Sequence, residues 1–452
     1  MLAAAWLWLV LYGFPGQMMP DTFEHLGEAR SGVYTDGSPP VFTLLFAISD
    51  AISGGPLLLF LAQTTVFVAG AYMTLRRLVP RGAHWITLVL CAFPPVFTTL
   101  PIVWKDALMP GLLLCGAGCL LGGRRILALA ALGLAISIRY NAFAAAFPLV
   151  VLLFEWRAGM HWLKRYAIAF AAWVGICTGA YTANDMLTDQ PMHLWASSLA
   201  LYDITGTLRF APETLPDETL APLLLETGLR FDKDIHAQLR ARYRPGNFFN
   251  LVAGPNAAWD VPIYGYVPAP AKQRAAVSRA FSELVTTYPL AYLENRWGMW
   301  RECLALRRNR HAYWAVPSRT YEYPENARAD GVNTYASRLQ RWFERALNPL
   351  WRRSSLFEPS MYFLLSLLLL PFTRRHRPAF ALLLSGIAVE LTLFFLASSP
   401  DYRYSHWMVT TTCIATIALI SQRMVAARGH DPALRRVTRE DPVDPGSPRH
   451  VS

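Results

Sequence analysis

The chain has 452 residues, of which 54% are hydrophobic and 16% are charged, and its formal net charge is +11 at pH 7. These averages do not separate soluble from membrane proteins, but many long apolar runs divided by short basic clusters exclude a single soluble core. Most arginines stand at the ends of apolar runs, so the positive charge indicates membrane topology rather than nucleic-acid binding.

Ten apolar segments predict membrane-spanning helices, because about 20 apolar residues, or somewhat fewer, cross a bilayer core. These segments are 1–19, 56–75, 84–100, 107–122, 126–138, 141–156, 166–184, 357–373, 378–397 and 406–421. The first has no basic residue ahead of it, which is typical neither of a cleaved signal nor of a firmly anchored helix, so we expect a few residues to precede it. The apolar stretch 40–53 is short, and we predict an interfacial or re-entrant helix there.

The basic clusters orient the ten spans. If 40–53 does not cross, all of them fall on one face, at 76–81, 124–125, 157–165, 374–377 and in the tail from Arg423. The positive-inside rule then places both termini in the cytoplasm, and we expect the membrane to be a bacterial inner membrane. The opposite face carries the first outer loop, the turns near residues 101–106 and 398–405, and the long segment 185–356, which is therefore predicted to be periplasmic.

The chain is thus predicted to be an all-α polytopic membrane protein with four parts. They are an N-terminal transmembrane module (1–184), an extracytoplasmic soluble segment (185–356), C-terminal transmembrane helices (357–421) and a disordered cytoplasmic tail (422–452). The segment 185–356 is too long for a connecting loop and too apolar for disorder, so we expect it to be mostly helical.

Two stretches of the soluble segment have a helical pattern. Residues 270–300 show helical periodicity that Pro289 breaks. Residues 336–353 form a basic amphipathic stretch before the next span, which predicts a helix at the membrane surface.

The first candidate site follows the first span. Asp21 and Glu24 stand three residues apart, which puts both on one face of a helix at the outer membrane surface. A partly desolvated carboxylate there is suited to act as a general base. The same residues also fit a solvated acidic loop that helps to set the topology.

Two further candidates lie between later spans. Lys105 and Asp106 form a turn at the outer face, where a lysine needs an anionic partner such as a lipid phosphate, or a local ion pair. Arg139 and Asn141 interrupt a long apolar stretch, and an arginine placed this way is a functional-site hypothesis unless it only touches headgroups.

The last candidate precedes the final span. Asp401 and Arg403 flank aromatic residues, and the guanidinium of Arg403 suits a phosphate, although Tyr402 and its aromatic neighbours also fit an interfacial belt. Glu390 lies inside the preceding span, where it either bonds a neighbouring helix or reaches the same outer cavity. A base and several cations at one face indicate group transfer from a lipid-linked phosphate.

These motifs resemble the GT-C superfamily of polytopic glycosyltransferases, which use polyprenyl-phosphate-linked sugars. The resemblance covers most of the membrane part. It rests on the acidic motif Asp21–Glu24 with the following Ser38–Pro40, on Trp104–Asp106, on Arg139–Asn141, on Asp401–Tyr404 and on the stretch Tyr288–Arg296.

The resemblance implies inverting transfer of one hexose or pentose from a polyprenyl-phosphate donor to an acceptor hydroxyl on the outer face. Asp21 would be the catalytic base, with Glu24 as a second acid, and Lys105, Arg139 and Arg403 would hold the donor phosphate. Residues that surround these in sequence or on the same face would support them, namely Asp106, Tyr140, Asn141, Glu390, Asp401 and Tyr402.

Partners and cofactors follow from the same reading. The expected partners are a polyprenyl-phosphate sugar, membrane lipids and a glycan, lipid or protein acceptor, whose site Asp203 would face, and no nucleic acid. No cofactor is required, although the carboxylates leave a divalent metal open, and the six cysteines show neither metal spacing nor a disulfide framework. The absence of a Gly-rich βαβ unit argues against a nucleotide-sugar donor.

Two other functions stay open. An O-antigen ligase or polymerase would also combine outer-face arginines with a large external loop. A lipid or glycan transporter is the third possibility, but such proteins often contain inverted repeats and charges near the midplane, and this chain shows no repeat.

Overall fold

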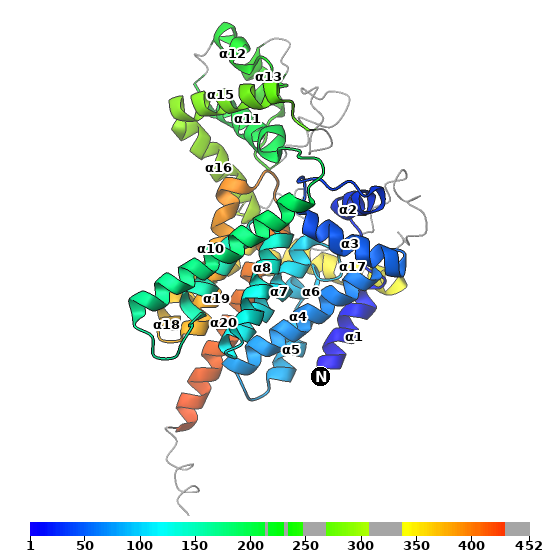
Figure 1. Cartoon of the computed structure of the whole chain (residues 1–452), viewed down its shortest axis with the longest axis vertical. Coiled ribbons are helices and arrows are strands. Elements are labelled where there is room, and N and C mark those ends of the chain that lie inside the picture. Colours follow the sequence, from blue (N-terminus) through cyan, green and yellow to red (C-terminus); the bar gives the residue numbers. More distant parts are fainter. Residues whose placement is uncertain (213–215, 230–233, 247–267, 307–336, 430–452) are drawn as a thin grey trace, which may run out of the picture.

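A computed structural model of the chain describes residues 1–429 except 213–215, 230–233, 247–267 and 307–336. The described residues are helical, and their only β-structure is two isolated bridges, Gln17 with Ile102 and Thr35 with Gln190. Figure 1 shows a bundle of helices with a second, smaller group of helices projecting from one end. The predicted all-α class is confirmed.

The helices follow one another with short connections. The bundle begins with α1 (Leu2–Gly13), α2 (Pro20–Ser31), α3 (Pro40–Ser53), α4 (Leu57–Leu78), α5 (Ala83–Ala92), α6 (Pro94–Phe97), α7 (Lys105–Leu121), α8 (Arg125–Ile138), α9 (Ala142–Leu153) and α10 (Trp162–Leu187). The projecting group contains the π-helical turn η1 (Trp195–Leu199), α11 (Ala200–Phe210), α12 (Asp217–Leu224), α13 (Ile235–Arg242), α15 (Ala271–Thr287) and α16 (Pro289–Cys303). The chain returns to the bundle with α17 (Arg338–Arg353), η2 (Ser355–Phe357), α18 (Pro359–Thr373), α19 (Arg377–Leu396) and α20 (Tyr402–Gly429).

Each of the ten predicted spans coincides with a helix, and three helices of the described chain are long and apolar enough to cross a membrane by length and composition: α4, α10 and α19. Large apolar side chains also stay exposed on the bundle's outer surface, among them Phe170 and Val174 on α10 and Leu364 and Leu368 on α18. Lipid would cover such a surface. The chain therefore has the helices and the exposed apolar surface of an integral membrane protein, whereas ten crossings stay a prediction.

Two sequence predictions need correction. The segment 84–100 is not one helix, because α5 ends at Ala92 and α6 begins at Pro94, where consecutive prolines cannot continue the hydrogen-bond ladder. The predicted disordered tail begins too early, because α20 continues unbroken through 422 to Gly429. Residues 430–452 lie outside the described residues.

The short apolar stretch 40–53 is helical over its predicted length. Pro40 begins α3, and Gly54 ends it in the left-handed conformation that glycine adopts without strain. The helix packs against α2 and α4 at the end of the bundle from which the second group projects. Whether α3 crosses the membrane stays a prediction.

The long segment 185–356 is helical where it is described. The predicted break at Pro289 is confirmed, because α15 ends at Thr287 and α16 begins at Pro289. Helices α11, α13 and α15 share a hydrophobic core of their own, with Leu201, Leu239 and Val277 fully buried in it. In contrast, α17 packs back on the bundle.

The amphipathic helix α17 lies against α1. The Phe343 ring makes edge-to-face contacts with Trp8 and Tyr12 at 4.9 and 5.3 Å between ring centroids. Its arginines and the exposed Trp342 lie outside this contact. The predicted helix is confirmed, and its place at a membrane surface stays a prediction.

Small residues bring α4 and α7 close together. A Cβ atom on Gly70 would lie 2.7 Å from the carbonyl oxygen of Gly111, and one on Gly118 would lie 2.7 Å from the Cβ of Met73. Close backbone approach through small residues is a common way to pack helices in lipid. This contact fixes α7, whose first turn carries Lys105 and Asp106.

Candidate active site

The connection before α7 is held by buried hydrogen bonds. The side-chain amide of Gln63, on α4, donates to the carbonyl oxygens of Leu100 and Ile102 at 2.7 and 2.8 Å. The backbone N–H of Gln17 donates to Pro101 at 3.0 Å, and that of Val103 donates back to Gln17 at 3.0 Å. These bonds fix the start of α7 against the connection between α1 and α2.

Helix α2 is anchored from two sides. The Thr22 hydroxyl donates to the Val103 carbonyl at 3.1 Å, which ties the start of α2 to the segment before α7. Beyond the end of α2, the backbone N–H of Tyr34 donates to the Asp189 carboxylate at 2.9 Å, and the N–H of Met192 donates to Asp36. The acidic loop is therefore a fixed part of the structure.

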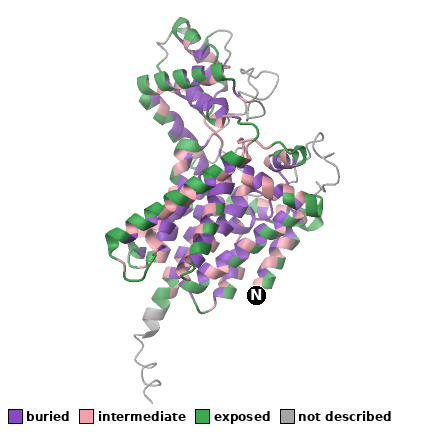
Figure 2. Cartoon of the chain, viewed as in Figure 1, coloured by how far each residue is buried: buried purple, intermediate pink, exposed green. Residues whose placement is uncertain are grey.

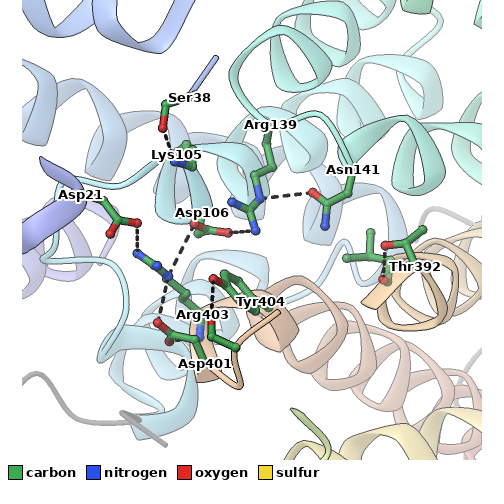
Figure 3. Close-up of polar contacts among 12 residues, drawn as sticks. Asp21, Ser38, Lys105, Asp106, Arg139, Asn141, Thr392, Asp401, Arg403 and Tyr404 are labelled. Carbon is green, nitrogen blue, oxygen red and sulfur yellow. Dashed lines mark hydrogen bonds and ion pairs between the residues drawn. The ribbon is translucent and has the colours of Figure 1, made fainter. Parts of the chain in front are cut away.

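Arg403 is the centre of the candidate site (Figure 3). Its Nη1 lies 2.8 Å from Oδ2 of Asp21, and its Nε lies 3.0 Å from Oδ2 of Asp401 and 3.8 Å from Oδ2 of Asp106. Its guanidinium carbon lies 4.3 Å from the centre of the Trp104 ring, which is a cation–π distance. Three carboxylates from three parts of the chain therefore meet one arginine.

Arg139 joins the same group from the end of α8. Its Nη2 lies 3.0 Å from Oδ1 of Asp106, and its Nε donates to the side-chain oxygen of Asn141 at 3.2 Å. The Tyr404 ring contacts both arginines, with its centre 5.0 Å from the guanidinium of Arg139 and 5.3 Å from that of Arg403. The Asp106 carboxylate thus bridges two arginines, and only 1% of its side chain is exposed.

Lys105 is the third cation. Its Nζ donates to the Ser38 hydroxyl at 3.0 Å, which links the start of α7 to the loop before α3. Burial lowers the pKa of Lys105, while the charge of Asp21 opposes that change. A lysine ammonium has three donors, so this contact leaves donors for another oxygen.

The two outer carboxylates differ in electrostatics. Burial would raise the pKa of Asp21, but the charges of Arg403 and Lys105 outweigh it and hold that pKa well below its usual range. Burial raises the pKa of Asp401 to about 6, although Arg403 opposes this shift. About a third of the Asp21 side chain, 34%, is exposed, so a ligand can reach this carboxylate.

The structure brings together most of the residues that the sequence suggested. Those that share contacts are Asp21, Lys105, Asp106, Arg139, Asn141, Asp401 and Arg403. Glu24 is different, because it lies exposed on α2 whereas Asp21 is partly buried.

Three other suggested residues have structural contacts elsewhere. The Tyr140 ring stacks on Tyr181 at 5.8 Å. The Tyr402 hydroxyl donates to the Pro95 carbonyl at 2.7 Å inside the bundle. Glu390 is fully buried and accepts a hydrogen bond from the Ser405 hydroxyl at 3.2 Å.

Two residues at the site escaped the sequence analysis. His25 is buried on α2, one turn after Asp21, and Glu28 follows it on the same face. The i, i+4, i+7 spacing of Asp21, His25 and Glu28 was the available signal, because it places all three on one side of a helix.

The chemistry that these groups offer is anion binding next to a carboxylate. Buried N–H groups of arginine and the indole of Trp104 are donors, and Nε1 of Trp104 has no hydrogen-bond partner in the structure. The described residues contain no group of three or more His, Cys, Asp or Glu side chains that could hold a metal ion. Metal dependence stays open.

Comparisons with known proteins are sparse. No protein-family model and no curated protein match the chain. A search of solved structures matches the crystal structure of ArnT from Cupriavidus metallidurans bound to undecaprenyl phosphate, at 15% identity and a TM-score of 0.34, over 98% of this chain and 80% of that one. A match this distant carries no argument about function, so the residues of the candidate site must carry it.

Proposed function

We propose that this protein is an integral membrane glycosyltransferase of the GT-C type, which moves one sugar from a polyprenyl-phosphate donor to an acceptor hydroxyl on the outer face. The observation that supports it best is the meeting of Arg403 with Asp21, Asp106 and Asp401, with Arg139 and Lys105 alongside. Such a group combines phosphate-binding cations with an accessible carboxylate.

The donor phosphate would compete with the carboxylates for the cations. A guanidinium presents donors in a planar fork that suits a phosphate, so the phosphate would take N–H groups of Arg403 that now face Asp21. Lys105 and Arg139 would add positive charge beside it. As the bond between the anomeric carbon and the phosphate oxygen breaks, these cations stabilise the phosphate, and no general acid is needed.

The same competition activates Asp21. A carboxylate that is paired with an arginine is a weak base, because the positive charge holds its pKa low. Once the phosphate engages Arg403, the pairing weakens and the pKa of Asp21 rises toward its usual value. Asp21 then removes the proton from the acceptor hydroxyl as its oxygen attacks the anomeric carbon from the opposite side, which gives inversion.

The test uses purified protein in lipid nanodiscs, a polyprenyl phosphate carrying one radiolabelled hexose or pentose, and envelope glycan, lipid and protein fractions as acceptors. We expect label to enter an acceptor fraction while an equal amount of polyprenyl phosphate is released. Asp21→Ala should abolish both. Undiminished transfer by this variant would refute the base assignment.

The other functions predict different outcomes in the same assay. A ligase or polymerase would move an oligosaccharide from a diphosphate carrier and leave the monophosphate donor unused. A transporter would move the lipid or sugar across vesicles without changing its covalent bonds. Transfer that disappears with a chelator and returns with a divalent cation would show that the reaction needs a metal.

We also propose the orientation of the site, with both termini cytoplasmic and segment 185–356 periplasmic in a bacterial inner membrane. Cysteines placed at Ser53 and Arg76 test it, because α4 separates these positions. A membrane-impermeant maleimide added from outside should label position 53 and not position 76. Labelling of 76 alone would reverse the orientation.

A further inference from the structure

Three titratable residues form a stripe along α2. Asp21, His25 and Glu28 follow one another at i, i+4 and i+7, so they occupy one side of the helix. Asp21 belongs to the candidate active site, whereas His25 and Glu28 have no part in the chemistry described above. His25 is 2% exposed and its ring packs edge-to-face on Phe42 at 4.8 Å.

Hydrogen bonds connect Glu28 to His25 through Thr43 of α3. The Glu28 carboxylate accepts from two hydroxyls: that of Thr35 at Oε1 and that of Thr43 at Oε2, the latter at 3.0 Å. Oγ1 of Thr43 also lies 2.8 Å from Nδ1 of His25. A threonine hydroxyl has one proton. Because Thr43 gives that proton to Glu28, it must accept the bond from His25, and Nδ1 carries the hydrogen.

The direction of this chain fixes the other nitrogen of the ring. In a neutral imidazole, one nitrogen donates and the other accepts, so Nε2 of His25 carries a free lone pair. Nε2 is buried and has no hydrogen-bond partner in the structure. A buried acceptor without a partner costs free energy, which is reasonable for a group that takes up a proton during a reaction.

The charges around His25 belong to the active site. Burial, together with the positive charges of Lys105 from α7 and Arg403 from α20, lowers the pKa of its imidazole, whereas Asp21 opposes that change. Burial raises the pKa of Glu28, although the hydroxyls of Thr35 and Thr43 oppose that shift. His25 is therefore neutral at neutral pH, and Asp21 is the nearest acid along its own helix face.

We propose that His25, held by Glu28 and Thr43 with its hydrogen on Nδ1, takes up at Nε2 the proton that Asp21 removes from the acceptor hydroxyl. This inference rests on the proposed function and deepens it. The acceptor oxygen bonds to the anomeric carbon, the phosphate leaves with the electron pair of the broken bond, and the proton passes from Asp21 to Nε2, directly or through one water molecule.

The electrostatics explain why a second proton acceptor is useful. Asp21 lies beside Arg403 and Lys105, which favour its charged form, so it holds a proton only briefly. An imidazole is intrinsically more basic than a carboxylate. Passing the proton to His25 restores the Asp21 carboxylate beside the cations after each turnover.

The test compares His25→Asn with wild type in the transfer assay. The asparagine amide can replace Nδ1–H as donor to Thr43, but it has no basic lone pair at the Nε2 position. We expect kcat to fall by about 10- to 100-fold, within the range that positioned acid–base groups contribute, while binding of unglycosylated polyprenyl phosphate stays unchanged. His84→Asn, at an exposed histidine on α5, is the matched control.

Two variants of Thr43 test the hydrogen-bond chain. Thr43→Val removes the acceptor for Nδ1–H and should lower kcat, whereas Thr43→Ser keeps the hydroxyl and should retain the wild-type rate. In ¹⁵N-histidine NMR spectra, the signal missing from His25→Asn should have the shifts of an Nδ1-protonated neutral ring in wild type and lose that preference in Thr43→Val.

The pH profile separates a proton acceptor from a structural residue. Protonation of Nε2 should lower kcat/KM on the acid side in wild type, and His25→Asn should lose this limb. Asp21, Glu28, Lys105, Asp401 and Arg403 also face this region, so any acid limb that remains in the variant belongs to them.

The outcomes are distinct. If wild type transfers sugar but His25→Asn keeps its kcat and its acid limb, the relay is wrong and the proposed function stands. A protonated Nε2 in the NMR spectrum of the neutral ring would also overturn the relay. If wild type transfers no sugar and only the NMR prediction holds, the proposed function fails, and the relay fails with it.

Discussion

Two groups of arginine and aspartate in this molecule differ in what surrounds them. In the projecting helices, Arg296 of α16 pairs with Asp203 of α11, and both side chains are almost completely buried, at 1% and 3% exposed. In the candidate active site, Arg403 meets three carboxylates, and one of them, Asp21, is 34% exposed. The first group is closed to any ligand, whereas the second can exchange partners.

The buried pair also connects the two parts of the molecule. Nη1 of Arg296 donates to the carbonyl of Ala397 at 2.8 Å, at the end of α19 and just before the segment that carries Asp401. Burial raises the pKa of Asp203 to about 6, against the effect of Arg296. Removing either partner would leave a buried charge, so this pair supports structure, and Asp203 is unsuited to contact an acceptor directly, unlike our sequence-based expectation.

The largest expected effect tests the open group. Asp21→Asn removes the base but keeps the size of the side chain, so transfer should fall by about 10²- to 10⁴-fold. The thermal midpoint should change little, because Asp21 is partly exposed. Radiolabel transfer and a thermal melt in nanodiscs measure both, with Glu283→Gln on α15 as an exposed control. A large loss of stability would make the two groups alike and break the comparison.

The closed group should show the opposite pattern. Arg296→Met leaves Asp203 buried without a cation, which should cost about 3–5 kcal/mol of stability. The deficit should shrink as pH falls through about 6, because a protonated Asp203 needs no partner. Melting curves between acid and neutral pH measure this. The double variant Asp203→Leu/Arg296→Met should recover much of the stability, and an additive loss would contradict a coupled pair.

A subtler change separates charge from geometry at the open group. Arg403→Lys keeps the positive charge but loses the planar fork, so it should lower kcat by about 10²- to 10³-fold, as for removal of one transition-state donor. Arg423→Lys, near the C-terminal end of α20, is the matched control. Equal rates for the two variants would show that charge alone suffices at position 403.

The smallest effect comes from a third pair that belongs to neither group. Arg30 at the end of α2 forms two hydrogen bonds of 2.9 Å to Asp50 of α3, but the Arg30 side chain is 33% exposed. Asp50→Asn should cost no more than about 1 kcal/mol and leave transfer intact. A loss of activity would instead show that the position of α3 controls the site.

Part of this architecture could be read from local patterns. The range 40–53 was predicted within the chain and is helix α3, and the break at Pro289 was placed correctly. Local rules also misjudged some ends, since the prolines at 94 and 95 divide one predicted span, and α20 continues to Gly429 past the predicted start of the tail.

The site was predicted in part for the same reason. Charged residues in apolar surroundings are costly, so Lys105, Arg139 and Arg403 were visible in the sequence. Their partners were not, because contacts such as Arg139 with Asp106 depend on how α7 and α8 pack. Glu390 and Tyr402 carry the same sequence signal but bond inside the bundle.

The sequence by itself determined the helical class, the apolar helices and the types of residue that could carry chemistry, because hydrophobic periodicity and the cost of charge in an apolar run are local properties. Only the tertiary structure decided that Asp21, Asp106 and Asp401 converge on Arg403, and that Thr43 directs the hydrogen of His25. Those relations join segments far apart in the chain, and no local pattern encodes the distance or the direction of a hydrogen bond between them.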